Sequence, residues 1–173
     1  MAETTEARIP ITNESMQHWI KLPGASTYLR VTEDTSASTE REANTYEPTY
    51  LDRKVQPKYN IGRTDTFSFE IDAHTGGGIH SELVKIEDEQ DVAIEYVRTL
   101  DFDFETGKSV AQTALVAKHA TAKLNVNPLS TDDIAPLKIS GTIVIESEYD
   151  YGTFNATTGT FSAKTDTSAL TGK

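Results

Sequence analysis

Apolar and polar residues alternate along much of this chain. Over residues 64–73, Phe67, Phe69 and Ile71 fall on one side of an extended segment, and the residues between them are polar. A period of two is typical of a strand with one buried and one solvated face. The same period returns in three later segments, at residues 92–104, 116–126 and 137–151. The pattern therefore predicts a mainly β fold with antiparallel strands.

One segment follows the helical period instead. Ile79, Leu83 and Ile86 lie four and three residues apart, directly after three glycines. This spacing places them on one face of a helix, so we expect a short amphipathic helix over residues 79–90. Strands with one solvated face and a single helix together predict an antiparallel β-sandwich with one flanking α-helix.

The remaining segments divide the chain into one domain with extensions. A length of 173 residues suits a single domain. Residues 1–27 are mostly polar and run to a Pro-Gly turn signal, which predicts an N-terminal arm. Residues 34–63 are rich in charge and tyrosine, and they predict a long loop or hairpin within a domain that spans residues 28–163. The small polar residues of 164–173 predict a C-terminal tail.

The charge of the chain excludes several kinds of partner. There are 27 acidic and 16 basic residues, giving a formal net charge of −11, which argues against a basic groove that grips nucleic acid. Between Glu82 and Glu105, nine acids accompany only two bases. Such a stretch serves either as a solvated face that keeps the protein soluble or as a surface that repels a passing polyanion. Apolar runs are short and the first residues lack a signal pattern, so we expect neither a signal peptide nor a membrane span.

Few residues have the spacing that catalysis or metal binding requires. The chain contains no cysteine, which excludes thiolate metal sites and cysteine nucleophiles. Asp101, Asp103 and Glu105 have the alternate spacing of a calcium loop, but the glycine and glutamate expected further on are misplaced, so we assign these acids to the wet face of a strand. The histidines and serines form no known catalytic motif. We therefore expect no enzyme activity, no metal and no cofactor.

The segment 34–63 combines aromatic, apolar and basic residues. Such side chains on a projection are costly unless a partner covers them. Its basic residues complement the acidic stretch 82–105, so copies of the chain can join head to tail into rings or helical tubes. The alternative is a hairpin that folds back on its own sheet. The predicted contact residues between subunits are Tyr46, Pro48, Tyr50, Leu51, Arg53, Lys54, Val55 and Tyr59.

The order of these segments resembles a known family. A polar arm and a long loop precede T-D-T-F-S-F-E-I-D-A, and then follow S-E-L-V-K-I, D-V-A-I-E-Y-V and a closing G-T-I-V-I-E-S-E-Y-D-Y-G-T-F-N-A-T-T-G-T-F. Over residues 28–163 this succession is similar to the major tail (tail tube) proteins of long-tailed bacteriophages. The resemblance implies a β-sandwich with a flanking helix, assembled as hexameric rings that stack into a hollow tube, with one sheet shared between subunits.

The resemblance also implies roles for particular segments. The loop 45–59 would contact the next ring, and polar strand faces would line a lumen through which double-stranded DNA passes without sticking. The acidic residues assigned to this lumen are Glu70, Asp72, Glu95, Asp101 and Asp103. The implied partners are further copies of the chain together with tape measure, tail terminator and tail tip proteins. The implied location is the tail of a virion that is made in the cytoplasm of a host bacterium.

Two other functions stay open from the residues alone. A carbohydrate-binding or adhesive β-sandwich usually presents exposed tryptophan or tyrosine platforms, and here the one tryptophan, Trp19, lies in the predicted arm. A hydrolase on a sandwich scaffold needs two carboxylates across a pocket, for which Glu95 with Asp101 or Asp103 are the candidates. Nothing in the spacing places these acids across a cleft.

Overall fold

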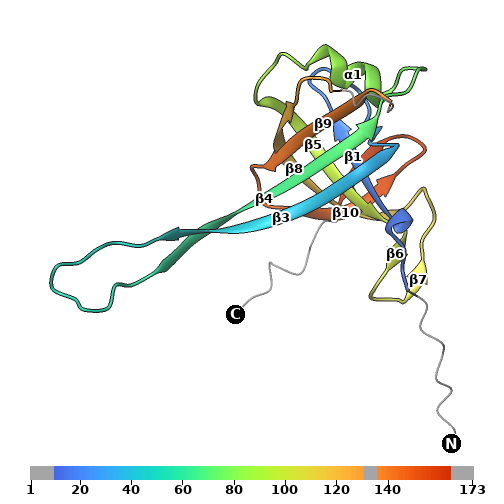
Figure 1. The fold of residues 1–173 in the computed structure, drawn as a ribbon. Coiled ribbons are helices and arrows are strands. Elements are labelled where there is room, and N and C mark those ends of the chain that lie inside the picture. Colours follow the sequence, from blue (N-terminus) through green and yellow to red (C-terminus); the bar gives the residue numbers. More distant parts are fainter. Residues whose placement is uncertain (1–9, 131–135, 165–173) are drawn as a thin grey trace, which may run out of the picture.

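The computed structural model describes residues 10–130 and 136–164 of the chain. Figure 1 shows strands throughout, a helix at one end of the body and a long hairpin that leaves it. The elements are η1 (Asn13–Ser15, a 3-10 turn), β1 (Met16–Lys21), β2 (Leu29–Arg30), β3 (Asp34–Tyr46), β4 (Tyr59–Asp72), α1 (Ile79–Lys85), β5 (Val92–Leu100), β6 (Phe102–Asp103), β7 (Lys108–Ser109), β8 (Leu115–Val126), β9 (Lys138–Ile145), β10 (Asp150–Asn155) and β11 (Thr160–Ala163). The prediction of a mainly antiparallel β fold with one flanking α-helix is confirmed.

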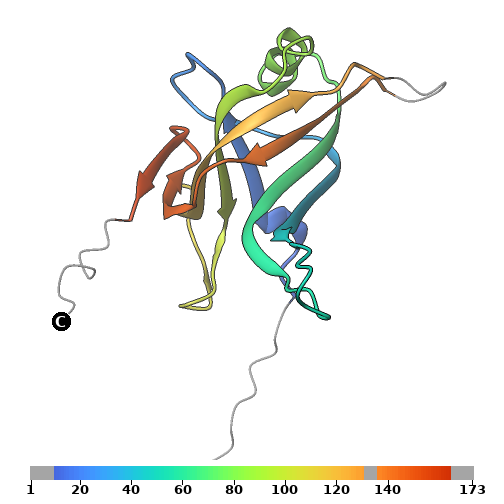
Figure 2. The same ribbon diagram turned by 90° about the vertical axis from the view of Figure 1, so that its left-hand side faces the viewer.

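Most of the strands belong to one bent sheet. Its main path has the order β2-β1-β5-β8-β9-β4-β3, and each pairing along it is antiparallel. Strands β10 and β11 form a hairpin that pairs with the first part of β8, and β6 and β7 make a separate small hairpin. The sheet curls so that β1 and β3, near its two ends, face each other across a cavity (Figures 1 and 2).

The concave side of this sheet encloses the main hydrophobic core. Buried side chains from β1, β4, β5, β8 and β9 meet there, among them Phe67, Phe69, Ile94 and Tyr96. Leu83 of α1 is fully buried and closes one end of the core. Because β4 and β5 both turn their apolar side chains toward this cluster, their polar faces point away from each other.

The helix is shorter than the sequence pattern predicts. α1 ends at Lys85, with Ile86 as its C-terminal cap, so the expectation of a helix to residue 90 is wrong at that end. Residues 87–91 carry acids and an amide and no apolar side chain that would extend the buried stripe. Acidic groups are also unfavourable at the C-terminus of a helix, where the backbone dipole is negative. The acidic run therefore forms a turn.

A second, smaller core lies on the opposite side of β1, β5 and β8. The hairpin β10–β11 covers this side, and Phe154 packs its ring against Trp19 at 4.8 Å and edge-on against Tyr28 at 5.5 Å. The close approach of the two hairpin strands requires a glycine, because a Cβ added at Gly152 would lie 2.1 Å from the carbonyl oxygen of Ser162. Part of the sheet is therefore buried on both faces.

The predicted N-terminal arm over residues 1–27 is wrong for its second half. Residues 16–21 form β1, which pairs with β5 along its whole length, and Trp19 and Ile20 are buried. Four successive residues of this strand, 17–20, are buried, so it shows no alternation that would identify a strand. Within residues 28–33, β2 pairs with β1, and the Val31 N–H donates to the carbonyl oxygen of His18 at 2.9 Å. Residues 1–9 of the arm and 165–173 of the C-terminal tail lie outside the described residues.

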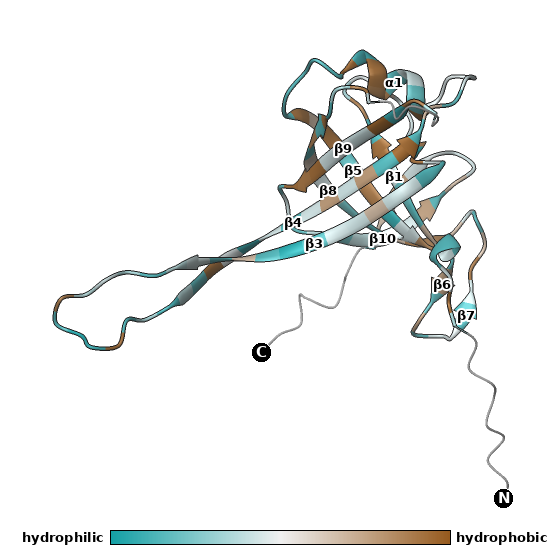
Figure 3. Cartoon of the chain, in the orientation of Figure 1, coloured by the Kyte–Doolittle hydropathy of each residue, from teal (hydrophilic) through white to brown (hydrophobic). Residues whose placement is uncertain are grey.

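Residues 34–63 belong to the hairpin β3–β4. The two strands pair from Asp34 to the opposed tyrosines Tyr46 and Tyr59, with irregularities near each end of β3. All thirteen residues of β3 are exposed, as are the first five residues of β4. Figure 3 shows that β3 and the projecting part of the hairpin are mostly hydrophilic, in contrast to the central strands. The sheet thus extends well beyond the hydrophobic core that supports it.

Candidate assembly surfaces

The first candidate surface is the free edge of β3. This strand stands at the end of the sheet and pairs with β4 on one side. At the other end of the sheet, β2 covers β1 over two residue pairs, Trp19 with Arg30 and Ile20 with Leu29. An edge strand presents backbone N–H and C=O groups that another strand can pair with. A long edge with no charged or proline interruption in residues 35–39 is a template for a second chain.

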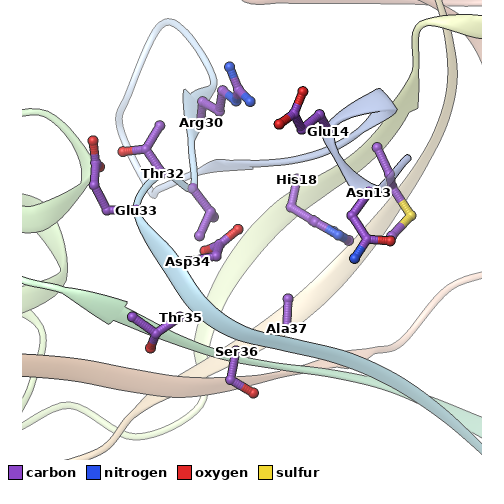
Figure 4. A pocket seen from close by; sticks show the side chains of 12 residues that line it. Asn13, Glu14, His18, Arg30, Thr32, Glu33, Asp34, Thr35, Ser36 and Ala37 are labelled. Carbon is purple, nitrogen blue, oxygen red and sulfur yellow. The ribbon is translucent and has the colours of Figure 1, made fainter. Parts of the chain in front are cut away.

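A cavity of about 620 Å³ lies between β3 and β1, where the curled sheet stays open. Figure 4 shows side chains from both sides of this seam, with Asn13, Glu14 and His18 on one side and Asp34 and Ala37 on the other. Most of the residues around it are polar. The seam is therefore a solvated gap between the two margins of one sheet.

A buried histidine, His18, lines the inner side of this seam. His18 stacks on Phe67 with ring centroids 4.0 Å apart, and its Nδ1 lies 2.7 Å from the hydroxyl oxygen of Tyr96. Burial, together with the positive charges of Arg98 and Lys118, lowers the pKa of His18 to about 4. The imidazole is therefore neutral at pH 7, and the open side of the core carries a hydrogen-bonded neutral pair.

The second candidate surface is the convex face of β3, β4 and β9. Phe67, Phe69 and Ile71 point into the core, so the residues between them point outward. Register places small polar and acidic side chains side by side on this convex face: Ser36, Ser38, Glu40 and Glu42 on β3, Thr64, Thr66, Ser68, Glu70 and Asp72 on β4, and Lys138, Ser140 and Thr142 on β9. The Lys138 ammonium lies 2.8 Å from Oε1 of Glu70. The face is rich in hydroxyl groups and carries four acids against Lys138.

The sequence pattern did not predict two of the acids on this face. Glu40 and Glu42 are exposed on β3, in register with Thr66 and Thr64 of β4. Their strand is polar on both sides, so it has no apolar period that would reveal it. The signal available in the sequence was the alternation of Ser36, Ser38, Glu40 and Glu42 with threonine, alanine and arginine.

The five acids predicted to line a lumen do not share one wall. Register places Glu95 of β5 on the same convex face of the sheet as Glu70 and Asp72 of β4, but the sheet curls between these strands, and Glu95 lies next to the second core. Asp101 follows β5 and Asp103 lies in the β6–β7 hairpin. Because the polar faces of β4 and β5 point in opposite directions, one channel wall holds at most part of this set.

Glu95 is occupied by contacts within its own chain. Its carboxylate accepts hydrogen bonds from the Tyr28 hydroxyl and from Lys21 Nζ, the latter at 2.9 Å, and His119 Nε2 lies 3.4 Å away. The hydrogen bond from Tyr28, followed by that from Lys21, lowers the pKa of Glu95, although partial burial opposes this. The cluster ties the loop before β2 to β5 and β8. Its role in this structure is to hold the second layer in place.

Asp103 is likewise a structural residue of its turn. Its carboxylate accepts hydrogen bonds from the backbone N–H of Glu105 at 2.9 Å and from the Thr106 hydroxyl at 2.8 Å. These bonds lower the pKa of Asp103. In the part of the chain that the structure describes, no three histidine, aspartate or glutamate side chains gather as a metal ion would require.

The third candidate surface is the tip of the β3–β4 hairpin, which holds the predicted contact residues. Leu51 is fully exposed at 102% and Val55 is exposed at 83%. Tyr46, Tyr50 and Tyr59 are also exposed, as are Arg53 and Lys54. Pro48 differs from the prediction, because it is buried within the loop and does not present its ring to a partner.

The tip is ordered by its own contacts. The Gln56 amide donates to the carbonyl oxygens of Tyr50 and Arg53 at 2.9 and 3.0 Å, and its oxygen accepts from the Tyr50 N–H at 2.6 Å. The Arg53 guanidinium lies 5.4 Å from the centre of the Tyr50 ring. Lys58 and Glu47 form an ion pair at the base of the loop. A loop organised in this way loses less conformational entropy when it binds a partner.

Two features bear on the other functions considered from the sequence. Trp19, the only tryptophan, is 7% exposed and cannot serve as a binding platform. Glu95 and Asp103 lie on different elements and are each engaged in local hydrogen bonds. No helix among the described residues is both long and apolar enough to span a membrane.

The structure thus combines an open edge strand, a polar convex face and an ordered tip with exposed apolar side chains beyond the core. The fold is that of tail-tube proteins. It matches the SPP1 tail tube with a TM-score of 0.59 and 12% identity, over 81% of this chain and 78% of that chain. It matches the tail of an empty gene transfer agent particle, determined with C6 symmetry, with a TM-score of 0.54 and 8% identity, over 82% of this chain and 98% of that chain.

A third similar structure is the tube-terminating cap of the anti-feeding prophage. The TM-score is 0.50 at 16% identity, over 88% of this chain and 100% of that chain. No protein-family model matches the sequence, and no curated protein matches it. At these identities the likeness establishes the fold, and the function has to be argued from the surfaces described above.

Proposed function

We propose that this chain is a tail-tube protein of a bacteriophage or a phage-derived particle. Copies join edge to edge into rings, and the rings stack into a hollow tube within the virion tail. The observation that carries the proposal is the thirteen-residue exposed strand β3 at the end of a sheet whose fold is shared with subunits of tail tubes. The alternative function, a carbohydrate-binding or adhesive module, receives no support from an exposed aromatic platform around Trp19.

Edge pairing explains why the sheet is left open. A single curled sheet leaves unpaired backbone groups along β3, and pairing with the margin of the next copy satisfies them. A wide barrel needs more strands than one chain supplies, so several copies have to share it. We propose six copies per ring, by analogy with the gene transfer agent tail of C6 symmetry.

The convex face of β3, β4 and β9 is the proposed wall of the bore. Its acids Glu40, Glu42 and Asp72 repel the phosphates of double-stranded DNA, and its serines and threonines offer no cation that would hold them. Lys138 is neutralised by Glu70. Glu95, Asp101 and Asp103 lie elsewhere and are not part of the proposed wall. The proposal needs no enzyme activity and no cofactor.

The hairpin tip is the proposed contact between stacked rings. The remaining proposed partners are tape measure, tail terminator and tail tip proteins at the inside and the ends of the tube. The virion is proposed to be assembled from protein made in the host cytoplasm. The tube itself is proposed to be held together by contacts between copies of this chain.

Electron microscopy of the purified protein tests the proposal. Concentrated protein should form rings or hollow tubes, and deletion of residues 45–59 should leave the domain folded but unable to stack. A protein that stays monomeric at every salt and protein concentration would refute the assembly function.

A pair of proline variants tests the β3 edge itself. Successive backbone N–H groups of a strand point to opposite edges, so one of Ser38→Pro and Thr39→Pro removes a bond to β4 and the other removes an outward N–H. Thermal unfolding of the dissociated protein identifies the second variant, because it keeps its melting temperature. That variant should fail to assemble, and normal tubes from it would show that β3 does not join the copies.

A further inference from the structure

An exposed apolar groove lies between the β6–β7 and β10–β11 hairpins. The cavity measures about 700 Å³ and is lined by Phe102, Phe104, Val116 and Tyr151, among others. Phe104 is 69% exposed and Tyr151 is 66% exposed. Large aromatic side chains that stay uncovered around one groove indicate a surface that a partner covers.

The groove is a continuation of the main core. Val116 lies directly opposite Leu100 in the β5–β8 register, on the same sheet face as the buried Tyr96 and Ala120. Over the buried half of this face, Phe67 of β4 covers Tyr96 with ring centroids 5.7 Å apart. The hairpin β3–β4 then leaves the body, since Tyr59–Arg63 are all exposed. The part of this sheet face around Leu100 and Val116 therefore lacks the cover that Phe67 gives to the part around Tyr96.

The hairpin tip carries the complementary side chains. Leu51 is fully exposed and Val55 is 83% exposed on this tip. In Figures 1 and 2 the β3–β4 hairpin leaves the body in a different direction from the β6–β7 hairpin. The tip of a chain is thus directed away from the groove of the same chain, and only a second copy brings the two together.

Charge favours the same pairing. Between Leu51 and Val55 the tip carries one acid, Asp52, and two bases, Arg53 and Lys54. The groove is lined by Asp103 and Glu105 on its β6–β7 side and by Lys164 on its β10–β11 side. At the inner end, Arg98 and Lys118 border Leu100 and Val116. The cations of the tip therefore fit the outer, acidic end of the groove, which fixes the direction in which the tip enters.

We propose that the tip of one copy, with Leu51 and Val55, docks in the Phe102–Phe104–Val116–Tyr151 groove of a second copy. This inference rests on the proposed self-assembly and names the receiving surface. The contact is heterologous, because the tip and the groove are different surfaces, so a subunit whose tip binds the next ring still offers its own groove to a tip of the preceding ring. A single tip is small, and its binding becomes effective through the many equivalent contacts of an assembled ring.

Engineered cysteines test this contact directly, because the natural chain has none. Protein with Leu51→Cys is mixed with protein with Phe104→Cys under assembly conditions and mild oxidation. A covalent dimer of the two is expected. The matched control replaces Phe104→Cys by Val84→Cys, a 41% exposed apolar residue on α1 at the far end of the body, and should give no dimer.

Electron microscopy of the unmodified protein distinguishes a failure of the groove assignment from a failure of the tube function. Tubes without a Leu51→Cys to Phe104→Cys disulfide, or with an equal yield for Val84→Cys, would overturn the groove assignment and leave the tube function standing. Absence of both tubes and disulfide would refute both. The specific disulfide without tubes would support the docking contact and count against the tube.

A charge exchange gives a second, independent measurement. Arg53→Glu and Glu105→Lys should each lower the assembled fraction about tenfold at low salt, and the combination should restore it to within about twofold. Glu105 is exposed and donates only its backbone N–H to the turn, so its replacement leaves the fold intact. Glu89→Lys, which removes an exposed acid beside α1, is the control and should have no effect. Failure of the double variant to recover would overturn the pairing.

Discussion

The two halves of β4 lie in different surroundings. From Asp65 to Ile71 every second residue is buried, and Phe67 contacts aromatic rings from β1, β4 and β5. From Tyr59 to Arg63 every residue is exposed, and the strand is held by β3 and by its own loop. Residues 65–71 are stabilised by side-chain burial, and residues 59–63 are held by backbone pairing. Residues 59–63 therefore leave apolar side chains and a strand edge exposed to solvent.

The largest expected difference between the two halves is in stability. Phe67→Ala should lower the free energy of unfolding by about 3–5 kcal/mol, because it opens a cavity among packed rings. Leu51→Ala at the tip should change it by less than about 0.5 kcal/mol, because the side chain contacts solvent. Urea unfolding of the dissociated protein measures both. A comparable loss for Leu51→Ala would mean that the tip is part of the folded core.

The next effect concerns pH and belongs to the packed half. His18 has a pKa of about 4 in the folded protein, against 6.5 for an unperturbed histidine. Between these values the unfolded chain binds more protons, so the free energy of unfolding should fall as the pH is lowered, by up to about 1.4 kcal/mol per pH unit. Below pH 4 this contribution levels off. Denaturant unfolding at a series of pH values measures the slope.

A double variant isolates the histidine. His18→Phe combined with Tyr96→Phe replaces both hydrogen-bonding partners by apolar rings of similar shape, so no buried polar atom is left alone. This variant should lack the slope between pH 6.5 and pH 4. A slope that persists in it would assign the effect to other groups.

The smallest effect lies at the junction of the two halves. Asp65 is buried and accepts two hydrogen bonds from the half-exposed Arg41, from Nε and Nη2, at 2.8 Å each. Asp65→Asn should lower the free energy of unfolding by about 1–2 kcal/mol at pH 7. Asp52→Asn at the exposed tip is the matched control and should have no measurable effect.

The pH dependence at Asp65 arises because the folded state favours the charged form of this group, whereas at His18 it favours the neutral form. The hydrogen bonds from Arg41 lower the pKa of Asp65 from its ordinary value of 3.8. The stabilisation is therefore complete above that value and is lost as the pH falls through the folded pKa. Asp65→Asn should reduce the pH dependence of the free energy of unfolding in that acid range alone. An unchanged acid limb would contradict the assigned role of the pair.

The sequence pattern predicted the parts of the fold that have one buried face. The alternation at Phe67, Phe69 and Ile71 identified β4, and similar runs identified β5, β8 and β9, because burial on one side leaves a period of two. It failed where both faces share one character. Residues 17–20 of β1 are buried on both faces, and β3 is polar on both, so neither strand shows a period. Charge alone also could not show that the curl of the sheet turns the strands that carry Glu95 and Glu70 in different directions.

The polar character of β3 has a consequence for alignment between copies. In a strand with one apolar face, a slip of one residue moves that face into water and is strongly disfavoured. In β3 a slip exchanges serine and glutamate for threonine and alanine, and burial does not penalise it. The bulges between Asp34 and Ser36 and between Asn44 and Thr45 are therefore the features that mark a position along this edge. In a long assembly, these two bulges would have to fix the register between neighbouring copies for the repeat to be uniform.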